Sequence, residues 1–159
     1  MTASIILLTE QALTAADAER IVGLYAPDAP SYRVLVPADT GRSLLGDVLD
    51  HLSLLELREA LDAVRGRDED DDRITATKAL DASVTELRAV GAVVDGSVVE
   101  GDPVAALTTA LDRQPADEVI IVTRPHAVED TFHTDWASRA RETLGVPVLH
   151  IYAGSSWLG

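Results

Sequence analysis

The segment from His126 to Asp135 carries the densest set of reactive side chains in the sequence. It holds two imidazoles, from His126 and His133, together with three carboxylates. Imidazole and carboxylate groups bind transition metals and transfer protons near neutral pH. The spacing matches no metal signature, and polar side chains are common in surface loops. We therefore expect a polar loop without a bound metal. A metal-assisted hydrolase built on residues 126–135, with His126 and His133 as ligands, is the second alternative.

A second group of polar side chains is expected at the ends of predicted strands and near the last helix. Arg124 follows an apolar run, and its planar guanidinium suits phosphate or carboxylate oxygens, with pairing to a neighbouring acid as the alternative. Ser138 and Arg139 could donate to an anion near the start of the last helix, or could serve as helix caps. The candidate ligand-binding residues are Thr9, Glu10, Arg124, Ser138 and Arg139.

Composition limits the classes of function. The 159 residues carry a net charge of −14, from 27 acidic and 13 basic side chains, and such a surface repels phosphate backbones and anionic lipid. No apolar run approaches the roughly 20 residues that span a bilayer. The chain has no cysteine, and its first residues lack the basic leader of a secretory signal. We expect a cytoplasmic protein that binds neither nucleic acid nor membrane.

Apolar runs and helical spacing alternate along the chain. The predicted strands are 5–8, 32–36, 92–99, 118–123 and 147–152. Between them, residues spaced as on helices include a capping box at Thr14 and Asp17. Helices separating strands predict a parallel sheet, because right-handed crossovers place helices on both faces.

The predicted fold is one α/β domain over residues 1–154, with a short tail at 155–159. It is a doubly wound, Rossmann-like, five-stranded parallel sheet in the order 3-2-1-4-5. Like charges repel, so the acidic run at 68–72 is expected to break, at 67–72, the helical region that follows the second strand. Gly91 is expected to end that region.

Three segments resemble the universal stress protein family. They are the turn Glu100-Gly101-Asp102-Pro103 with the helix after it, the stretch 116–122, and the stretch 144–151. The chain looks most like the diverged actinobacterial-type members. The resemblance implies a stress-response or regulatory protein without catalytic turnover. It also implies a homodimer through the fifth strand, with Val148, His150 and Tyr152 at the edge.

The sequence departs from the ATP-binding pattern of that family. ATP-binding members carry glycines after the fourth strand, where backbone amides approach the phosphates. Here the matching positions hold Arg124, Ala127 and Ala137, although Ser138 keeps a hydroxyl. We therefore expect no tightly bound ATP and no obligatory cofactor. The first alternative is a sensor that binds ATP, AMP or another small anion in the crevice at the strand ends.

Overall fold

The computed structural model describes residues 3–38, 55–123 and 130–154, and within these ranges it does not describe the side chains of 55–70 and 130–136. The strands are β1 (Ser4–Thr9), β2 (Ser31–Pro37), β3 (Val93–Val99), β4 (Glu118–Thr123) and β5 (Val148–Tyr152). All neighbouring pairs are parallel, and the order is β3-β2-β1-β4-β5. The predicted fold class and strand order are confirmed.

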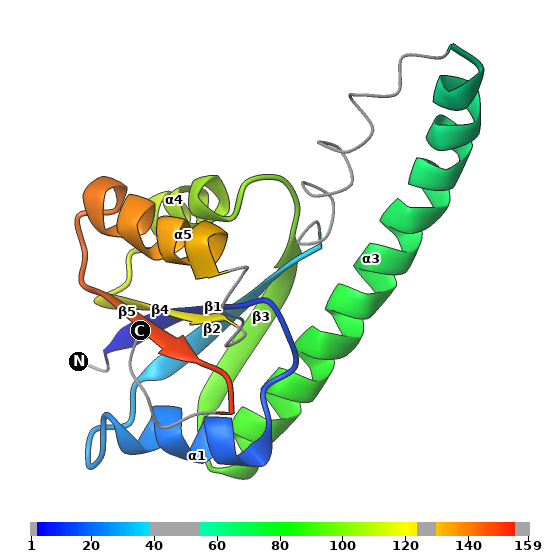
Figure 1. The fold of residues 1–159 in the computed structure, drawn as a ribbon. Helices are drawn as coiled ribbons and strands as arrows, with labels where there is room; N and C mark the ends of the chain where they lie inside the picture. The colour runs from blue at the N-terminus through cyan, green and yellow to red at the C-terminus, as the bar shows by residue number, and fades with distance from the viewer. Residues whose placement is uncertain (1–2, 39–54, 124–129, 155–159) are drawn as a thin grey trace.

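Helices cover both faces of the sheet (Figure 1). With the numbering of Figure 1, α1 (Ala15–Gly23) and α3 (Leu55–Ala89) lie on one face, and α4 (Pro103–Arg113) and α5 (Asp130–Thr143) on the other. Alternate residues of β1 divide between the two cores. Ile5 and Leu7 belong to the first, whereas Ile6 and Leu8 belong to the second, and all four are almost completely buried. This double burial explains why β1 and β4 are continuous apolar runs.

Local signals in the sequence fix several helix ends. Thr14 and Asp17 form the predicted capping box of α1. Asp102 caps α4, whose first residue is Pro103, a position where a missing amide costs little. After α3, Gly91 has a φ of 89°, and the amides of Gly91 and Ala92 donate to carbonyls of the last turn. This is the glycine-terminated helix end that the sequence predicts.

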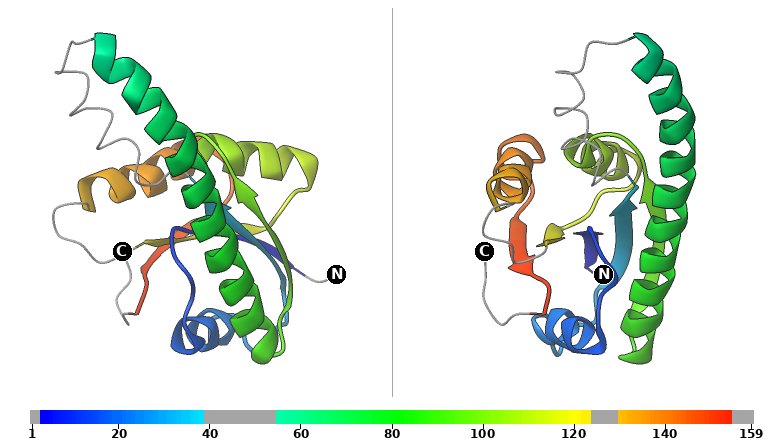
Figure 2. Two further views of the ribbon diagram at one scale, coloured as in Figure 1. Left: turned by 90° about the vertical axis from the view of Figure 1, so that its right-hand side faces the viewer. Right: turned by 45° about the vertical axis from the view of Figure 1, so that its right-hand side comes forward.

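The predicted helix break at 67–72 is wrong. α3 is a single helix of 35 residues that continues through the acidic run, and its first turns stand away from the sheet (Figure 2). Like charges at helical spacing cost only a few tenths of a kcal/mol per pair, and they leave the helical backbone conformation accessible. A proline, in contrast, costs about 3 kcal/mol in a helix interior. The repulsion is therefore too weak to end this helix.

A second correction concerns the segment predicted as a loop. α5 begins at Asp130, so residues 130–135 are helical and Ser138 lies in the interior of the helix. Ser138 and Arg139 are therefore not near the start of the last helix, as predicted, and cannot cap it. Within the described ranges, none of the helices is long and apolar enough to cross a membrane.

Candidate functional site

The carboxyl ends of the parallel strands bring several of the predicted residues to one edge of the sheet. Thr9 ends β1, and its side chain is fully buried. The Thr9 hydroxyl donates to the carbonyl of Gln11 at 2.8 Å, so it stabilises the turn that leaves the strand. Thr9 therefore acts within the turn, while the next residue, Glu10, faces a cavity.

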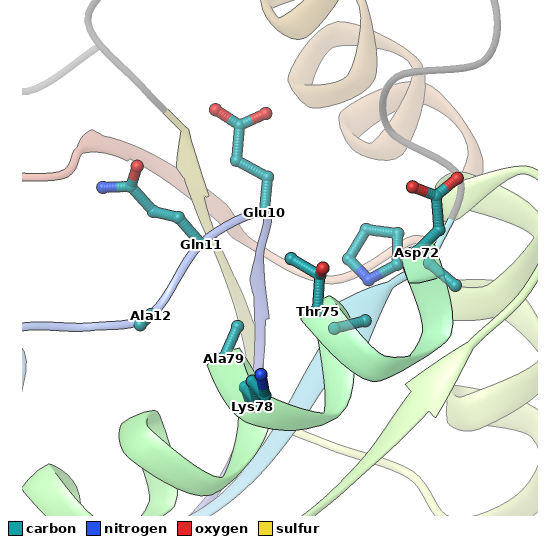
Figure 3. A pocket seen from close by; sticks show the side chains of 10 residues that line it. Glu10, Gln11, Ala12, Asp72, Thr75, Lys78 and Ala79 are labelled. Carbon is teal, nitrogen blue, oxygen red and sulfur yellow. The ribbon is translucent and has the colours of Figure 1, made fainter. Parts of the chain in front are cut away.

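That cavity lies between the ends of β1 and β2 and the helix α3. Its volume is about 320 Å³. Glu10 and Asp72 stand on opposite sides of it, with Thr75 between them (Figure 3). The lining residues are Glu10, Gln11, Ala12, Pro37, Ala38, Asp72, Thr75, Ala76, Lys78 and Ala79. The cavity combines two carboxylates, one ammonium group and a hydroxyl with a small apolar surface. Of the lining residues from α3, only Asp72 falls in the predicted break at 67–72, so its helical position is the one that the sequence analysis did not predict.

The predicted turn at Gly101, Asp102 and Pro103 is tied to α5. The Arg139 guanidinium donates to both carboxylate oxygens of Asp102, at 3.1 and 2.9 Å. The same carboxylate accepts from the amide of Ala105 at 3.0 Å and so caps α4. The hydrogen bond from Arg139 and that from the Ala105 amide hold the pKa of Asp102 below its ordinary value, against the smaller effect of burial. The Asp102 carboxylate thus accepts hydrogen bonds both from Arg139 and from the N-terminus of α4.

The other side of this turn is tied to α3. Arg73 forms an ion pair with Glu100, just before Gly101, whose φ of 78° is a conformation that favours glycine. Arginines from helices on opposite faces of the sheet therefore hold the two carboxylates of one turn. Sequence reasoning found the turn but not its partners, because Arg73 lies 27 positions before Glu100 and Arg139 lies 37 positions after Asp102.

At β5, the predicted edge residues differ in exposure. Val148 and Tyr152 are half-buried, but His150, which was expected at the dimer edge with them, is 2% exposed. His150 Nε2 lies 2.7 Å from the Thr123 hydroxyl, and the rings of His150 and Tyr152 lie 4.9 Å apart. A polar partner on β4 lets the imidazole remain buried. His150 therefore belongs to the protein interior, and only its strand belongs to the edge.

Asp17 joins α1 to the end of β5, a connection that sequence reasoning missed. Its carboxylate accepts from the amide of Gly154 at 2.8 Å, and the neighbouring Arg20 donates to the carbonyl of Tyr152 at 3.0 Å. Burial by itself raises the pKa of Asp17, but the hydrogen bonds from Gly154 and Thr14 together lower it by more. The pKa of Asp17 is therefore below its ordinary value. The capping box identified Asp17 as a helix cap, yet no pattern in the sequence connects it with Gly154.

Three predicted site residues lie beyond what the structure describes. Arg124 and His126 fall outside the described residues, and the side chain of His133 is not described. Among the side chains that are described, no group of three or more histidines, cysteines, aspartates or glutamates could hold a metal ion. The roles suggested for Arg124, His126 and His133 stay predictions.

Solved structures of universal stress proteins have the same fold. The protein from Archaeoglobus fulgidus in complex with dAMP matches with a TM-score of 0.56 and 16% identity, over 95% of this chain and 99% of that chain. A universal stress protein in complex with cAMP matches with a TM-score of 0.55 and 12% identity, over 95% and 97%. A structure of a universal stress protein from Archaeoglobus fulgidus matches with a TM-score of 0.53 and 17% identity, over 95% of both chains.

Neither a protein-family model nor a curated protein matches the sequence. The resemblance predicted from the sequence is therefore confirmed by structure, at the level of the fold.

Proposed function

We propose that this chain, with its universal stress protein fold, is a non-catalytic regulatory protein that acts through self-association and does not bind ATP tightly. The observation that carries the proposal is the pairing of Asp102 with Arg139. Arg139 follows Ser138, the position that keeps the hydroxyl of the ATP-binding pattern. A triphosphate at that place would have to compete with a carboxylate that already makes two hydrogen bonds to the guanidinium.

The acidity of the chain supports the same conclusion. With a net charge of −14, the protein repels a highly charged anion before contact, whereas a mononucleotide carries less charge. Two proteins of the same fold were solved with dAMP and with cAMP, which each carry a single phosphate group. We propose that any nucleotide bound by this chain is of that smaller kind, and that its affinity is weak.

Self-association is proposed to use the outer edge of β5. In the described sheet, β5 pairs with β4 on one side and with no strand on the other. An open edge of unpaired backbone groups is a template for pairing with another chain, and a second copy related by a two-fold axis offers the same edge. Pairing of two β5 strands would cover Val148 and Tyr152, which are both half-buried in one chain.

Sedimentation velocity tests this assembly with one substitution at each edge of the sheet. We expect the wild-type protein to sediment at about 50 µM with twice the 16.9 kDa mass of one chain. At that concentration a dimer with a Kd of about 1 µM, or about −8.2 kcal/mol, is the main species. Val148→Lys on β5 should give a monomer, and Val93→Lys on β3 should leave the dimer intact. A monomeric wild-type protein, or equal effects of the two variants, would contradict the proposal.

The second candidate function is a sensor of a small nucleotide, favoured by the cavity beside Glu10. A volume of about 320 Å³ lies in the range of small-molecule sites. Its place at the carboxyl ends of β1 and β2 is where open parallel sheets bind ligands. Thr75 lines the cavity, whereas Thr77, on the same helix and also exposed, does not.

Thermal unfolding with and without AMP tests the sensor. A ligand at 100 times its Kd stabilises the folded state by about 2.7 kcal/mol, which raises the melting temperature by several degrees. We expect Thr75→Trp to abolish this shift by filling the cavity and Thr77→Trp to keep it. No shift of the wild-type protein with AMP at millimolar concentration rules the sensor out and leaves the self-association proposal standing.

A further inference from the structure

The face of the sheet opposite α3 carries a groove at its β3 edge. Along β3, Val94 belongs to the core beneath α3, and a Cβ at Gly96 would lie 2.6 Å from Leu80 Cδ1 of that helix. The alternate residues of the strand, Asp95 and Ser97, point to the other face and are exposed. The sheet beside α4 is therefore open to solvent where β3 forms its edge.

The floor of the groove is a piece of the β2–β3 ladder, and its wall is α4. In the parallel register, Arg33 lies beside Asp95, and Leu35 lies beside Ser97. One hollow, of about 350 Å³, is lined by Arg33, Leu35, Asp95, Gly96, Ser97, Ala110, Arg113 and Gln114. A second, of about 460 Å³, shares Leu35, Ser97, Ala110 and Arg113 with the first. The two hollows are thus parts of one elongated groove.

Two guanidinium groups lie at one end of this groove. Arg33 donates to the carbonyls of Ala110 and Gln114 at the end of α4, and its Nε is buried without a hydrogen-bond partner. The Arg113 guanidinium has no hydrogen bond or ion pair to any residue that the structure describes. Asp95 adds one carboxylate, so this end of the groove has a charge of about +1 on a strongly acidic protein.

The rest of the groove is apolar or already neutralised. Leu35, Val99, Ala106 and Ala110 line the second hollow, next to small polar groups. The carboxylates at its far end belong to the turn at Gly101, and both are paired with arginines. Among the described residues, the unpaired positive charge of the groove therefore lies at its Arg113 end, and the apolar surface of the second hollow extends from there toward the turn at Gly101.

We propose that this groove binds an apolar carboxylate, a small acid with an aliphatic or aryl body. The carboxylate lies on the guanidinium of Arg113, whose planar fork donates to two oxygens, and Arg33 adds positive potential. The apolar body lies over Leu35 and Val99 toward Ala106. The groove is separate from the carboxyl-edge cavity beside Glu10, and the inference does not depend on the proposed function.

Octanoate is the probe, and ¹H–¹⁵N correlation spectra of the full chain are the measurement. We expect saturable shifts of the Ser97, Ala106 and Ala110 amides. Arg113→Gln should weaken binding about tenfold, the loss expected for one charge-assisted contact. The matched control is Arg88→Gln, which also removes one positive charge. Arg88 belongs to α3, on the opposite face of β3, and donates to the Val94 carbonyl. This control should bind octanoate as the wild-type protein does.

Two further comparisons separate the carboxylate head from the apolar body. Octylammonium, with the same chain and the opposite charge, should not produce these shifts. Ala106→Leu should weaken octanoate binding and leave the weaker binding of acetate unchanged. The proposal is overturned if octanoate gives no saturable shift, if Arg113→Gln binds as wild type, or if inorganic phosphate or octylammonium binds as well as octanoate.

Discussion

Replacing Asp17 by asparagine should destabilise the protein by removing one charge and little volume. Asp17 is 1% exposed, and its two carboxylate oxygens accept four hydrogen bonds. One oxygen accepts from the amide of Gly154 at 2.8 Å and from Arg20 at 3.5 Å. The other accepts from the amide and the hydroxyl of Thr14, at 3.0 and 2.9 Å. Only one oxygen of an asparagine can remain an acceptor.

The size of the effect follows from those contacts. In its best orientation the asparagine side chain keeps its oxygen on Gly154 and donates its amide to the Thr14 hydroxyl, and this leaves the Thr14 amide without an acceptor. A hydrogen bond to a charged group contributes about 1.5 to 3 kcal/mol, so we expect a loss of about 2 kcal/mol in the free energy of unfolding. For a chain of this length, each kcal/mol shifts the melting temperature by about 2 to 4 °C.

Urea unfolding at pH 7, followed by circular dichroism, measures this loss. Glu19→Gln in the same helix is the control, because Glu19 is exposed and its substitution should change stability by less than about 0.5 kcal/mol. An Asp17→Asn variant as stable as the control would refute the reasoning. It would mean that the contacts to Thr14 and Gly154 do not stabilise the folded state.

The pH dependence of this difference has a defined sign. Burial by itself raises the pKa of Asp17, but the hydrogen bonds from Gly154 and Thr14 together outweigh it, so the pKa is lowered in the folded protein. A lowered carboxyl pKa stabilises the folded state above the unfolded-state pKa of about 3.9. That stability is lost as the pH falls through the folded-state value. The gap between the wild-type protein and Asp17→Asn should therefore close in acid.

Two pairs of substitutions test packing and the carboxyl-edge ion pair. Gly96→Ala should lower the free energy of unfolding by about 1 to 3 kcal/mol, because a Cβ there would lie 2.7 Å from the Val34 carbonyl oxygen. A Cβ at Gly23 would meet no atom within 4 Å, so Gly23→Ala should be neutral or stabilising. Asp102→Ala should cost about 1 to 2 kcal/mol through the lost helix cap, and Arg139→Gln less than about 1 kcal/mol, because that pair is exposed. Urea unfolding measures all four, and equal effects within either pair would contradict the argument.

The sheet could be predicted from the sequence because its signals are local. Continuous apolar runs such as Ile5–Leu8 are typical of strands buried on both faces, and helices between them require parallel pairing. The capping box at Thr14 and the glycine at 91 likewise depend on neighbours within a few residues. The acidic run at 68–72 led to the wrong prediction of a helix break, because its charge repulsion was not compared with the larger free-energy cost of a helix breaker such as proline.

The candidate site was less predictable because its contacts join distant parts of the chain. Asp102 with Arg139, Glu100 with Arg73, and Asp17 with Gly154 are each separated by 27 or more positions. Residue types alone suggested that Arg139 donates to an anion or caps a helix. The structure instead pairs its guanidinium with the Asp102 carboxylate.

Calorimetric titration of the wild-type protein with magnesium ATP tests the central claim most directly. The claim is that a chain with the universal stress protein fold, a net charge of −14 and an Asp102 carboxylate paired with Arg139 does not bind ATP tightly. We predict no saturable heat up to about 1 mM ATP, which corresponds to a binding free energy weaker than about −4.1 kcal/mol. Saturable binding with a Kd in the micromolar range would contradict the account.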